Sequence, residues 1–168
     1  MLRIASHPVT LGILAAVLLV SPTPGVGQEG TPVEGAWVVV SITSPDGETN
    51  AQPRPGLFVF TKTHYSMMFV ASEEPRAQYT GEEMTDADMV AAYTTFVANS
   101  GRYEVNGNEL TSRAFVAKDP NYMGAWPENA ITCTFEIDGE GMLHLTWPED
   151  WGGYKAMMRQ VDGEPAPW

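Results

Sequence analysis

The sequence predicts an all-β protein in which eight antiparallel strands run up and down around a closed barrel, with one α-helix between the third and fourth strands. Short stretches of alternating apolar and polar residues recur along the chain from residue 33 onward. Turn-forming pairs such as Asn106-Gly107 and Asp138-Gly139 separate several of these stretches. Closure of such a meander into a barrel removes the unpaired edges of an open sheet. A two-sheet sandwich is the alternative arrangement.

The first 27 residues are predicted to be a signal peptide rather than part of the fold. Arg3 precedes a run of about a dozen apolar residues, small residues follow at Gly25 and Gly27, and no acidic residue occurs before Glu29. A spanning helix needs roughly 20 apolar residues. We therefore expect cleavage after Gly27 and export to the periplasm or the extracellular space, with an uncleaved membrane anchor as the alternative. The expected divisions of the chain are the signal peptide (1–27), a short N-terminal segment (28–33), the barrel domain (34–162) and a C-terminal tail (163–168).

The charge and cysteine content exclude several classes of partner and chemistry. The 168 residues carry a formal net charge of −12. Arg3 is the only charged residue of the predicted signal peptide, so cleavage would change the net charge to −13. Such a surface repels nucleic-acid phosphates and anionic lipid, and it favours a soluble monomer. Cys133 is the single cysteine, so no internal disulfide can form. Because Cys133 alternates with Ile131 and Phe135, we expect a buried small side chain rather than a nucleophile.

Alternation and turn residues place each strand. The first strand, 35–43, opens on Gly35-Ala36-Trp37, and a loop rich in Pro, Gly, Asp and Asn follows it. The remaining strands are predicted at 57–62, at 65–72, in a hairpin over 101–118, in a second hairpin over 130–147 and at 154–161.

The helix is predicted over 85–101. Apolar residues recur there at helical spacing, at Met89, Ala92, Tyr93, Phe96 and Val97. Thr85 can cap the start, Asp86 and Asp88 lie in the first turn where the helix dipole favours acids, and Gly101 stands where a helix C-terminus prefers glycine. We expect the apolar stripe to pack on the barrel as a satellite core, with gating of one barrel end as the alternative.

Three stretches resemble the bacterial lipocalin-like domain proteins, a branch of the calycin barrels. They are Gly35-Ala36-Trp37 at the first strand, "GLFVFTKTHYSMMFV" over the second and third strands, and "SGRYEV" directly after the helix, followed by "DPNYMG" at 119–124. The resemblance spans about 34–161 and implies a barrel with a cavity, since the broader lipocalins bind small apolar molecules and a few are enzymes. It also implies a structural pair at the barrel floor, in which Arg159 lies across the indole of Trp37.

The candidate ligand site is the barrel interior, because eight strands enclose room for side chains or for one small ligand. Tyr65, Met67 and Phe69 share one face of their strand, which we expect to point inward, and Tyr103 is expected to join them. Met and aromatic side chains suit an adaptable pocket, although ordinary core packing fits the same pattern. Arg113 is either a solvated charge on the outside or an inward cation that would bind an anionic ligand group.

No motif in the sequence specifies a reaction, a cofactor or a metal. His64 and His144 are too isolated to form a zinc motif, Asp86 and Asp88 lack a calcium-binding loop, and no nucleophile elbow is present. The leading expectation is non-covalent binding of a small, mainly apolar ligand inside the barrel. The alternatives are a cavity enzyme of the isomerase or cyclase type acting on a small hydrophobic substrate, and a filled barrel that serves as a structural or interaction module.

Overall fold

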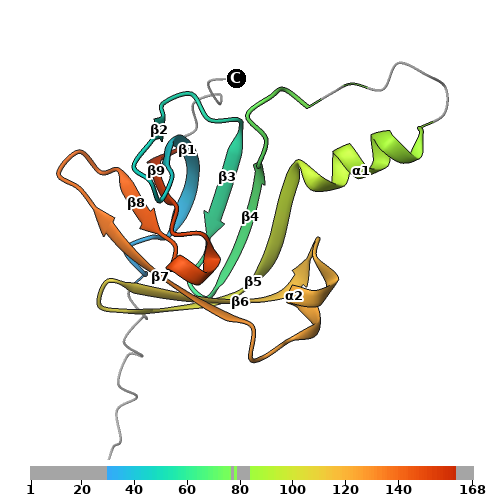
Figure 1. Ribbon diagram of the computed structural model, residues 1–168. Helices are drawn as coiled ribbons and strands as arrows, with labels where there is room; N and C mark the ends of the chain where they lie inside the picture. The colour runs from blue at the N-terminus through green and yellow to red at the C-terminus, as the bar shows by residue number, and fades with distance from the viewer. Residues whose placement is uncertain (1–29, 77, 79–83, 162–168) are drawn as a thin grey trace, which may run out of the picture.

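Nine strands form one antiparallel sheet in the order β2-β1-β3-β4-β5-β6-β7-β8-β9, and β1 also pairs with β9, so that the sheet closes on itself (Figure 1). The computed structural model describes residues 30–76, 78 and 84–161. Within that part of the chain β2 is only two residues long, and eight longer strands make up the barrel wall. The predicted eight-stranded up-and-down barrel is therefore confirmed.

The elements lie close to their predicted places. Their bounds are β1 (Gly35–Thr43), β2 (Thr49–Asn50), β3 (Gly56–Phe60), β4 (His64–Val70), α1 (Asp86–Thr94), β5 (Phe96–Asn106), β6 (Glu109–Ala117), α2 (Pro120–Gly124), β7 (Ala130–Ile137), β8 (Leu143–Thr146), the 3-10 helix η1 (Glu149–Trp151) and β9 (Lys155–Gln160). The main helix lies between β4 and β5, which are the third and fourth long strands of the chain. Three short elements were not predicted from the sequence: the strand β2, the helix α2 and the 3-10 helix η1.

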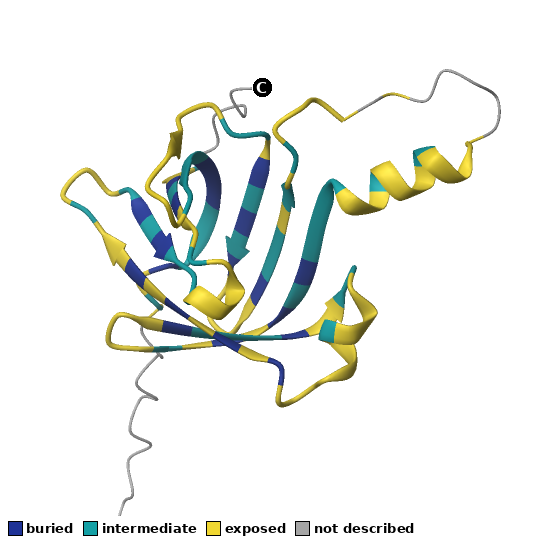
Figure 2. Ribbon diagram, viewed as in Figure 1, coloured by how far each residue is buried: buried dark blue, intermediate teal, exposed yellow. Residues whose placement is uncertain are grey.

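The two ends of the barrel differ. At one end, the floor, lie the tight turns between β3 and β4, between β5 and β6, and between β7 and β8, together with the segment that precedes β1. At the other end, the mouth, lie the longer connections that carry β2, α1, α2 and η1 (Figure 1). Figure 2 shows the buried residues along the strands and the exposed residues over the loops and α1.

One core cluster of buried side chains from all eight long strands and the segment before β1 lies inside the barrel. Its members are Val33, Trp37, Val39, Phe58, Phe60, Tyr65, Tyr103, Leu110, Ile131, Cys133, Phe135, Leu143, Leu145, Ala156 and Met158. Phe60 and Tyr103 meet edge to face near the floor, with ring centroids 5.2 Å apart. Burial of these apolar side chains is the main source of the barrel's stability, because no disulfide is available.

The floor is closed by the segment before β1 and not by the predicted cation. Trp37 is 2% exposed, and its indole N–H donates to the Val33 carbonyl oxygen at 2.8 Å. Across the β1–β9 pairing Gln160 lies opposite Trp37, and Arg159 lies opposite Val38. Residues directly opposite in an antiparallel pair share a face. Arg159 is accordingly exposed on the outer surface, and the expected stacking of Arg159 on Trp37 is corrected.

Helix α1 begins as predicted but ends at Thr94. Its start is a capping box, in which the Thr85 hydroxyl accepts from the Asp88 N–H at 3.2 Å and the Asp88 carboxylate accepts from the Thr85 N–H at 2.9 Å. From Phe96 the chain is already β5, and Phe96 lies opposite Val70 of β4. Aromatic and β-branched residues here gain more from pairing with a neighbouring strand than from continuing a helix. Tertiary pairing thus overrides the helical spacing of the apolar residues.

The predicted satellite core on α1 is also corrected. No residue of α1 is buried, and Met89 and Tyr93 are 48% and 49% exposed. Figures 1 and 2 show the helix projecting from the barrel beside the start of β5. The side of Tyr93 is instead covered by Lys118, whose Nζ lies 4.1 Å from the ring centroid. The apolar stripe of α1 therefore stays exposed to solvent and does not pack on the barrel.

Gly101 belongs to a bulge between β5 and β6 rather than to a helix C-terminus. The β5–β6 register shifts between Ser100 and Gly101, so that Ser100 faces Val116 and Gly101 faces Ala114. A Cβ atom on Gly101 would lie 1.9 Å from the carbonyl oxygen of Arg113. Glycine is needed at this position because the two backbones approach more closely than any side chain permits.

Candidate functional site

On the inner face of the barrel, the side chains nearer the mouth are partly exposed, whereas those of the core cluster are buried. Five apolar residues there pack on the core and keep part of their surface open: Ile42, Met67, Phe69, Tyr122 and Trp147. We call these five residues the mouth cluster. They come from β1, β4, α2 and the residue after β8, so four separate parts of the chain build one apolar surface.

Aromatic rings form much of this surface. The Phe69 ring stacks on Phe58 with centroids 6.2 Å apart and planes 11° from parallel, and Trp147 meets Phe58 edge-on at 6.2 Å. The Tyr122 ring lies 5.4 Å from Trp151 of η1. Rings in these arrangements stabilise one another and present flat apolar faces to a neighbouring molecule.

Uncharged polar groups lie beneath the mouth cluster. The Tyr65 hydroxyl is buried and donates to Oδ1 of Asn99 at 2.7 Å, and Asn99 is 7% exposed. Burial raises the pKa of Tyr65, and the nearby Tyr122 raises it further. Burial also raises the pKa of Tyr122, which the neighbouring Tyr65 and Ser112 hydroxyls partly offset. Both phenols therefore stay protonated at neutral pH.

Asn129 ties α2 to the barrel wall. Its side-chain Nδ2 donates to the carbonyl oxygen of Ala114 at 2.7 Å and to that of Tyr122 at 2.9 Å. The Asn129 Oδ1 atom and the Tyr122 hydroxyl are buried and make no hydrogen bond with the described residues. A buried polar atom without a partner costs roughly 1–3 kcal/mol. A polar group that formed a hydrogen bond with either atom would remove this cost.

Comparison with known proteins identifies the family. Residues 34–145 match the lipocalin-like domain family. The chain belongs to this family. Two solved structures are similar to this lipocalin-like protein. One is a lipocalin-like protein from Bacteroides uniformis, 17% identical, covering 78% of this chain and 100% of its own, with a TM-score of 0.46. The other is an uncharacterized protein from Bacteroides eggerthii, 13% identical, covering 76% of this chain and 98% of its own, with a TM-score of 0.45. No curated protein matches the sequence.

The structure of this lipocalin-like protein places four of the five predicted ligand residues on the inner face. Tyr65, Met67 and Phe69 pack against the core, as the alternation along β4 predicts. Tyr103 is buried on the same face but lies at the floor, where its hydroxyl donates to the Thr61 carbonyl oxygen at 2.5 Å. Tyr103 is therefore a structural residue of the floor in this arrangement, whereas ligand contact by the β4 residues stays a prediction.

Arg113 takes the outward one of the two orientations that the sequence left open. Its guanidinium lies 3.7 Å from the carboxylate of Glu104. Its partner across β5 is the exposed Arg102, so both residues face away from the core. The interior accordingly receives no cation from Arg113.

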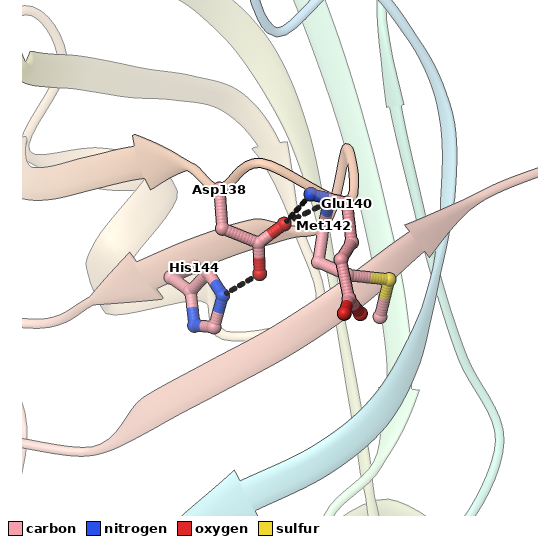
Figure 3. Close-up of polar contacts among 4 residues, drawn as sticks. All are labelled: Asp138, Glu140, Met142 and His144. Carbon is pink, nitrogen blue, oxygen red and sulfur yellow. Dashed lines mark hydrogen bonds and ion pairs between the residues drawn. The ribbon is translucent and has the colours of Figure 1, made fainter.

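The two histidines of the described chain, His64 and His144, also lie outside the barrel. His144 faces away from Leu143 and Leu145, and its Nε2 donates to Oδ2 of Asp138 at 2.7 Å (Figure 3). The other Asp138 oxygen accepts from the backbone N–H groups of Glu140 and Met142, both at 2.9 Å. The hydrogen bond from His144 and those from the backbone hold the pKa of Asp138 below its usual value. This cluster clamps the β7–β8 turn.

His64 is exposed at the start of β4, where the centroid of its ring lies 6.2 Å from that of Phe115. Cys133 is buried, and burial raises the pKa of its thiol to about 12, so that it is not a thiolate nucleophile at neutral pH. Among the described residues no three His, Cys, Asp or Glu side chains gather as a metal site. Within the same ranges no helix is long and apolar enough to cross a membrane.

Two open hollows are the best defined on the described part of this lipocalin-like protein. One has a volume of about 180 Å³ and is lined by Ser72, Glu74, Pro75, Arg76, Asp88, Ala91, Ala92 and Thr95. The other has a volume of about 220 Å³ and is lined by Ser66, Met67, Met68, Ala98, Asn99, Ser100, Val116, Ala117 and Lys118. Both are smaller than the usual 300–1,000 Å³ or so of a ligand pocket. Of the mouth cluster only Met67 lines either hollow, so neither of them is a pocket formed by that cluster.

Sequence reasoning missed Tyr122, Asn99 and Asn129. Tyr122 belongs to the "DPNYMG" stretch, which carried a family resemblance but no periodicity that would place it inside a barrel. Asn99 was assigned to the helix, so its inward orientation on β5 was hidden. The Asp119 side chain, which accepts from the Asn121 N–H at 2.9 Å, and Pro120 are a recognisable helix start that would have revealed α2.

Proposed function

We propose that this lipocalin-like protein binds a small, mainly apolar molecule non-covalently at the mouth of its barrel. The observation that carries the proposal is the mouth cluster, whose apolar side chains stay partly exposed on the inner face while the core beneath them is buried. Transfer of apolar surface out of water contributes roughly 25 cal/mol per Å². A ligand that covers Met67, Phe69 and Trp147 would gain this stabilisation, and Met67 can change rotamer to fit it.

The structure offers little support for catalysis in the barrel. A general acid or base needs a pKa near the working pH. The buried Tyr65 phenol and Cys133 thiol instead have raised pKa values, and His144 lies on the outer face. Binding without reaction is therefore the better reading of the interior.

A filled barrel that serves as a structural or interaction module is the second candidate. It is favoured by the core cluster, to which all eight long strands contribute, and by the two hollows, of whose lining only Met67 belongs to the mouth cluster. The two candidates differ in one respect, namely whether the mouth cluster takes up a small molecule.

We also propose that the protein is exported to the periplasm or the extracellular space and acts there as a monomer. The predicted signal peptide and tail lie outside the described residues. The support is the sequence pattern of residues 1–27 and the acidic composition of the chain.

Native mass spectrometry of the protein purified from its own host tests the binding proposal. We expect a small-molecule adduct on the unaltered protein, its loss in Phe69→Ala, and its retention in Met68→Ala. Met68 is a matched control because it is the next residue of β4 and points outward, 42% exposed. Circular dichroism checks that both variants are folded.

The absence of any adduct, together with no thermal stabilisation by a panel of small apolar compounds, would favour the filled barrel. An adduct that survives Phe69→Ala but is lost from Met68→Ala would move the site to the outer face of β4.

A further inference from the structure

We propose that the ligand of the mouth is uncharged and carries a hydrogen-bond acceptor that the Tyr122 hydroxyl binds. This inference rests on the proposed function and narrows the class of ligand. It joins two features of the described interior, namely the lack of buried charged side chains and the unpartnered hydroxyl of Tyr122, a member of the mouth cluster.

The described residues that are buried in the barrel offer no counter-ion to a charged ligand. The buried polar residues of the described chain are Asn99 and Asn129, both neutral amides. Arg113 is paired with Glu104 on the outside, and His144 is paired with Asp138 there. A carboxylate or an ammonium group that entered the barrel would lose its hydration and gain no opposite charge, which costs several kcal/mol.

Tyr122 supplies the donor. Its hydroxyl is buried and makes no hydrogen bond with the described residues, whereas the Tyr65 hydroxyl already donates to Asn99. Burial raises the pKa of Tyr122, so the phenol keeps its proton. A carbonyl or ether oxygen can accept a hydrogen bond from this hydroxyl, and a wholly apolar ligand cannot.

The position of Tyr122 is fixed from two sides. Its backbone carbonyl accepts from Asn129 at 2.9 Å, and its ring packs against Trp151 at 5.4 Å. Donors that are held in place before a ligand arrives bind it with less loss of entropy. Tyr122 belongs to the same mouth cluster as Met67 and Phe69, and the proposal places the acceptor of a ligand that rests on this cluster against the Tyr122 hydroxyl.

Equilibrium dialysis with three small aromatic compounds of matched size tests the inference on the protein purified from its host. The compounds are ethylbenzene, which is apolar, acetophenone, which adds a neutral carbonyl, and benzoate, which is an anion at neutral pH. We expect acetophenone to bind more tightly than ethylbenzene and benzoate to be excluded. In Tyr122→Phe the affinity for acetophenone should fall by roughly two- to tenfold, the worth of one hydrogen bond, while that for ethylbenzene is unchanged.

Tyr93→Phe is the control variant, because it removes the hydroxyl of an exposed tyrosine on α1 that lies away from the core. It should alter neither affinity. Benzoate binding as tightly as acetophenone would overturn the inference. A Tyr122→Phe variant that keeps the preference for acetophenone would overturn it too, because the Tyr122 hydroxyl would then not be the donor that binds the carbonyl. Equal binding of ethylbenzene and acetophenone would leave the proposed function standing and overturn this inference alone. Failure of all three compounds to bind would contradict both.

Discussion

The side chain of Trp37 illustrates how single residues are held in this barrel. Its indole N–H donates to the main chain of Val33, and its ring belongs to the buried core. Arg159, which a family resemblance placed on the ring, lies on the opposite face of the wall. Trp37 and Arg159 lie on opposite faces because the register of β1 and β9 pairs Arg159 with Val38 and not with Trp37. In a strand, a shift of one residue moves a side chain from the core to the solvent.

Trp37→Ala should lower the free energy of unfolding by roughly 3–5 kcal/mol, because it removes a large buried side chain and leaves a cavity. Arg159→Ala should change it by no more than about 0.5 kcal/mol, since Arg159 is exposed. Urea denaturation of the two variants measures both values. An Arg159→Ala effect as large as that of Trp37→Ala would show that the guanidinium does support the floor.

Gly101→Ala should destabilise the protein by at least about 1–3 kcal/mol, because the new Cβ would lie 1.9 Å from the Arg113 carbonyl oxygen and force β5 and β6 apart. Gly139→Ala is the control, since nothing lies within 4 Å of a Cβ at that turn position, and it should stay within about 0.5 kcal/mol of the unaltered protein. Thermal unfolding followed by circular dichroism compares them. Equal melting temperatures for the two variants would contradict the close approach at the bulge.

Among the elements, the β7–β8 hairpin carries a specific pH dependence. The Asp138 pKa is lowered from its usual value of 3.8 by the hydrogen bonds from His144 and from the turn backbone (Figure 3). A carboxyl with a lowered pKa stabilises the folded state above its unfolded pKa, and that contribution disappears as the pH falls through the folded pKa. The loss should therefore occur below about pH 4.

Asp138→Asn keeps the shape of the turn and removes the charge. The melting temperature of the unaltered protein should exceed that of Asp138→Asn at pH 5, and the difference should shrink as the pH is lowered toward about 2. Differential scanning calorimetry across this range measures it. A difference that stays constant down to pH 2 would mean that the Asp138 charge does not contribute to folding.

Helix α1 shows where element prediction from local pattern stops. Its start was predictable because the capping box of Thr85 and Asp88 depends on only four consecutive residues. Its end was not, because residues from Phe96 onward keep helical spacing while their backbone pairs with β4. The same error hid Asn99, which lies in the part of β5 that was assigned to the helix.

At the scale of the whole molecule, closure by the β1–β9 pairing makes the wall one continuous sheet. Each of the eight long strands has a partner on both sides, so the wall cannot open without breaking strand pairs. The reactivity of Cys133 measures opening of the barrel, because its side chain is buried in the core cluster and burial raises the pKa of its thiol to about 12. We expect cooperative unfolding of the barrel.

The thiol of Cys133 should react with Ellman's reagent at pH 8 only as fast as the barrel opens, and its exposure in urea should follow the same midpoint as tryptophan fluorescence and circular dichroism. Stopped-flow labelling and equilibrium unfolding provide the measurements. Full labelling of the native protein at the rate seen in denaturant would show that the core around β7 is open to solvent.

The barrel and the inner face of β4 could be predicted because each rests on local features. Turn pairs such as Asn106-Gly107 mark where strands reverse, and alternation marks which residues share a face. The mouth site was only half predictable. Met67 and Phe69 follow from alternation, whereas Tyr122 enters from a loop whose position depends on the hydrogen bonds of Asn129.

By itself, the sequence determined the number and order of the long strands, the start of the helix and the buried state of Cys133, since all of these depend on composition and on spacing along the chain. The lipocalin-like family followed from the resemblance of three short stretches to that family. Only the tertiary structure decided which face Arg159 and Arg113 occupy, where α1 ends, and that Tyr122 lies beneath the mouth. These depend on register between distant strands and on loop packing, and a bulge such as that at Gly101 changes the inward and outward alternation without any change in local residue pattern.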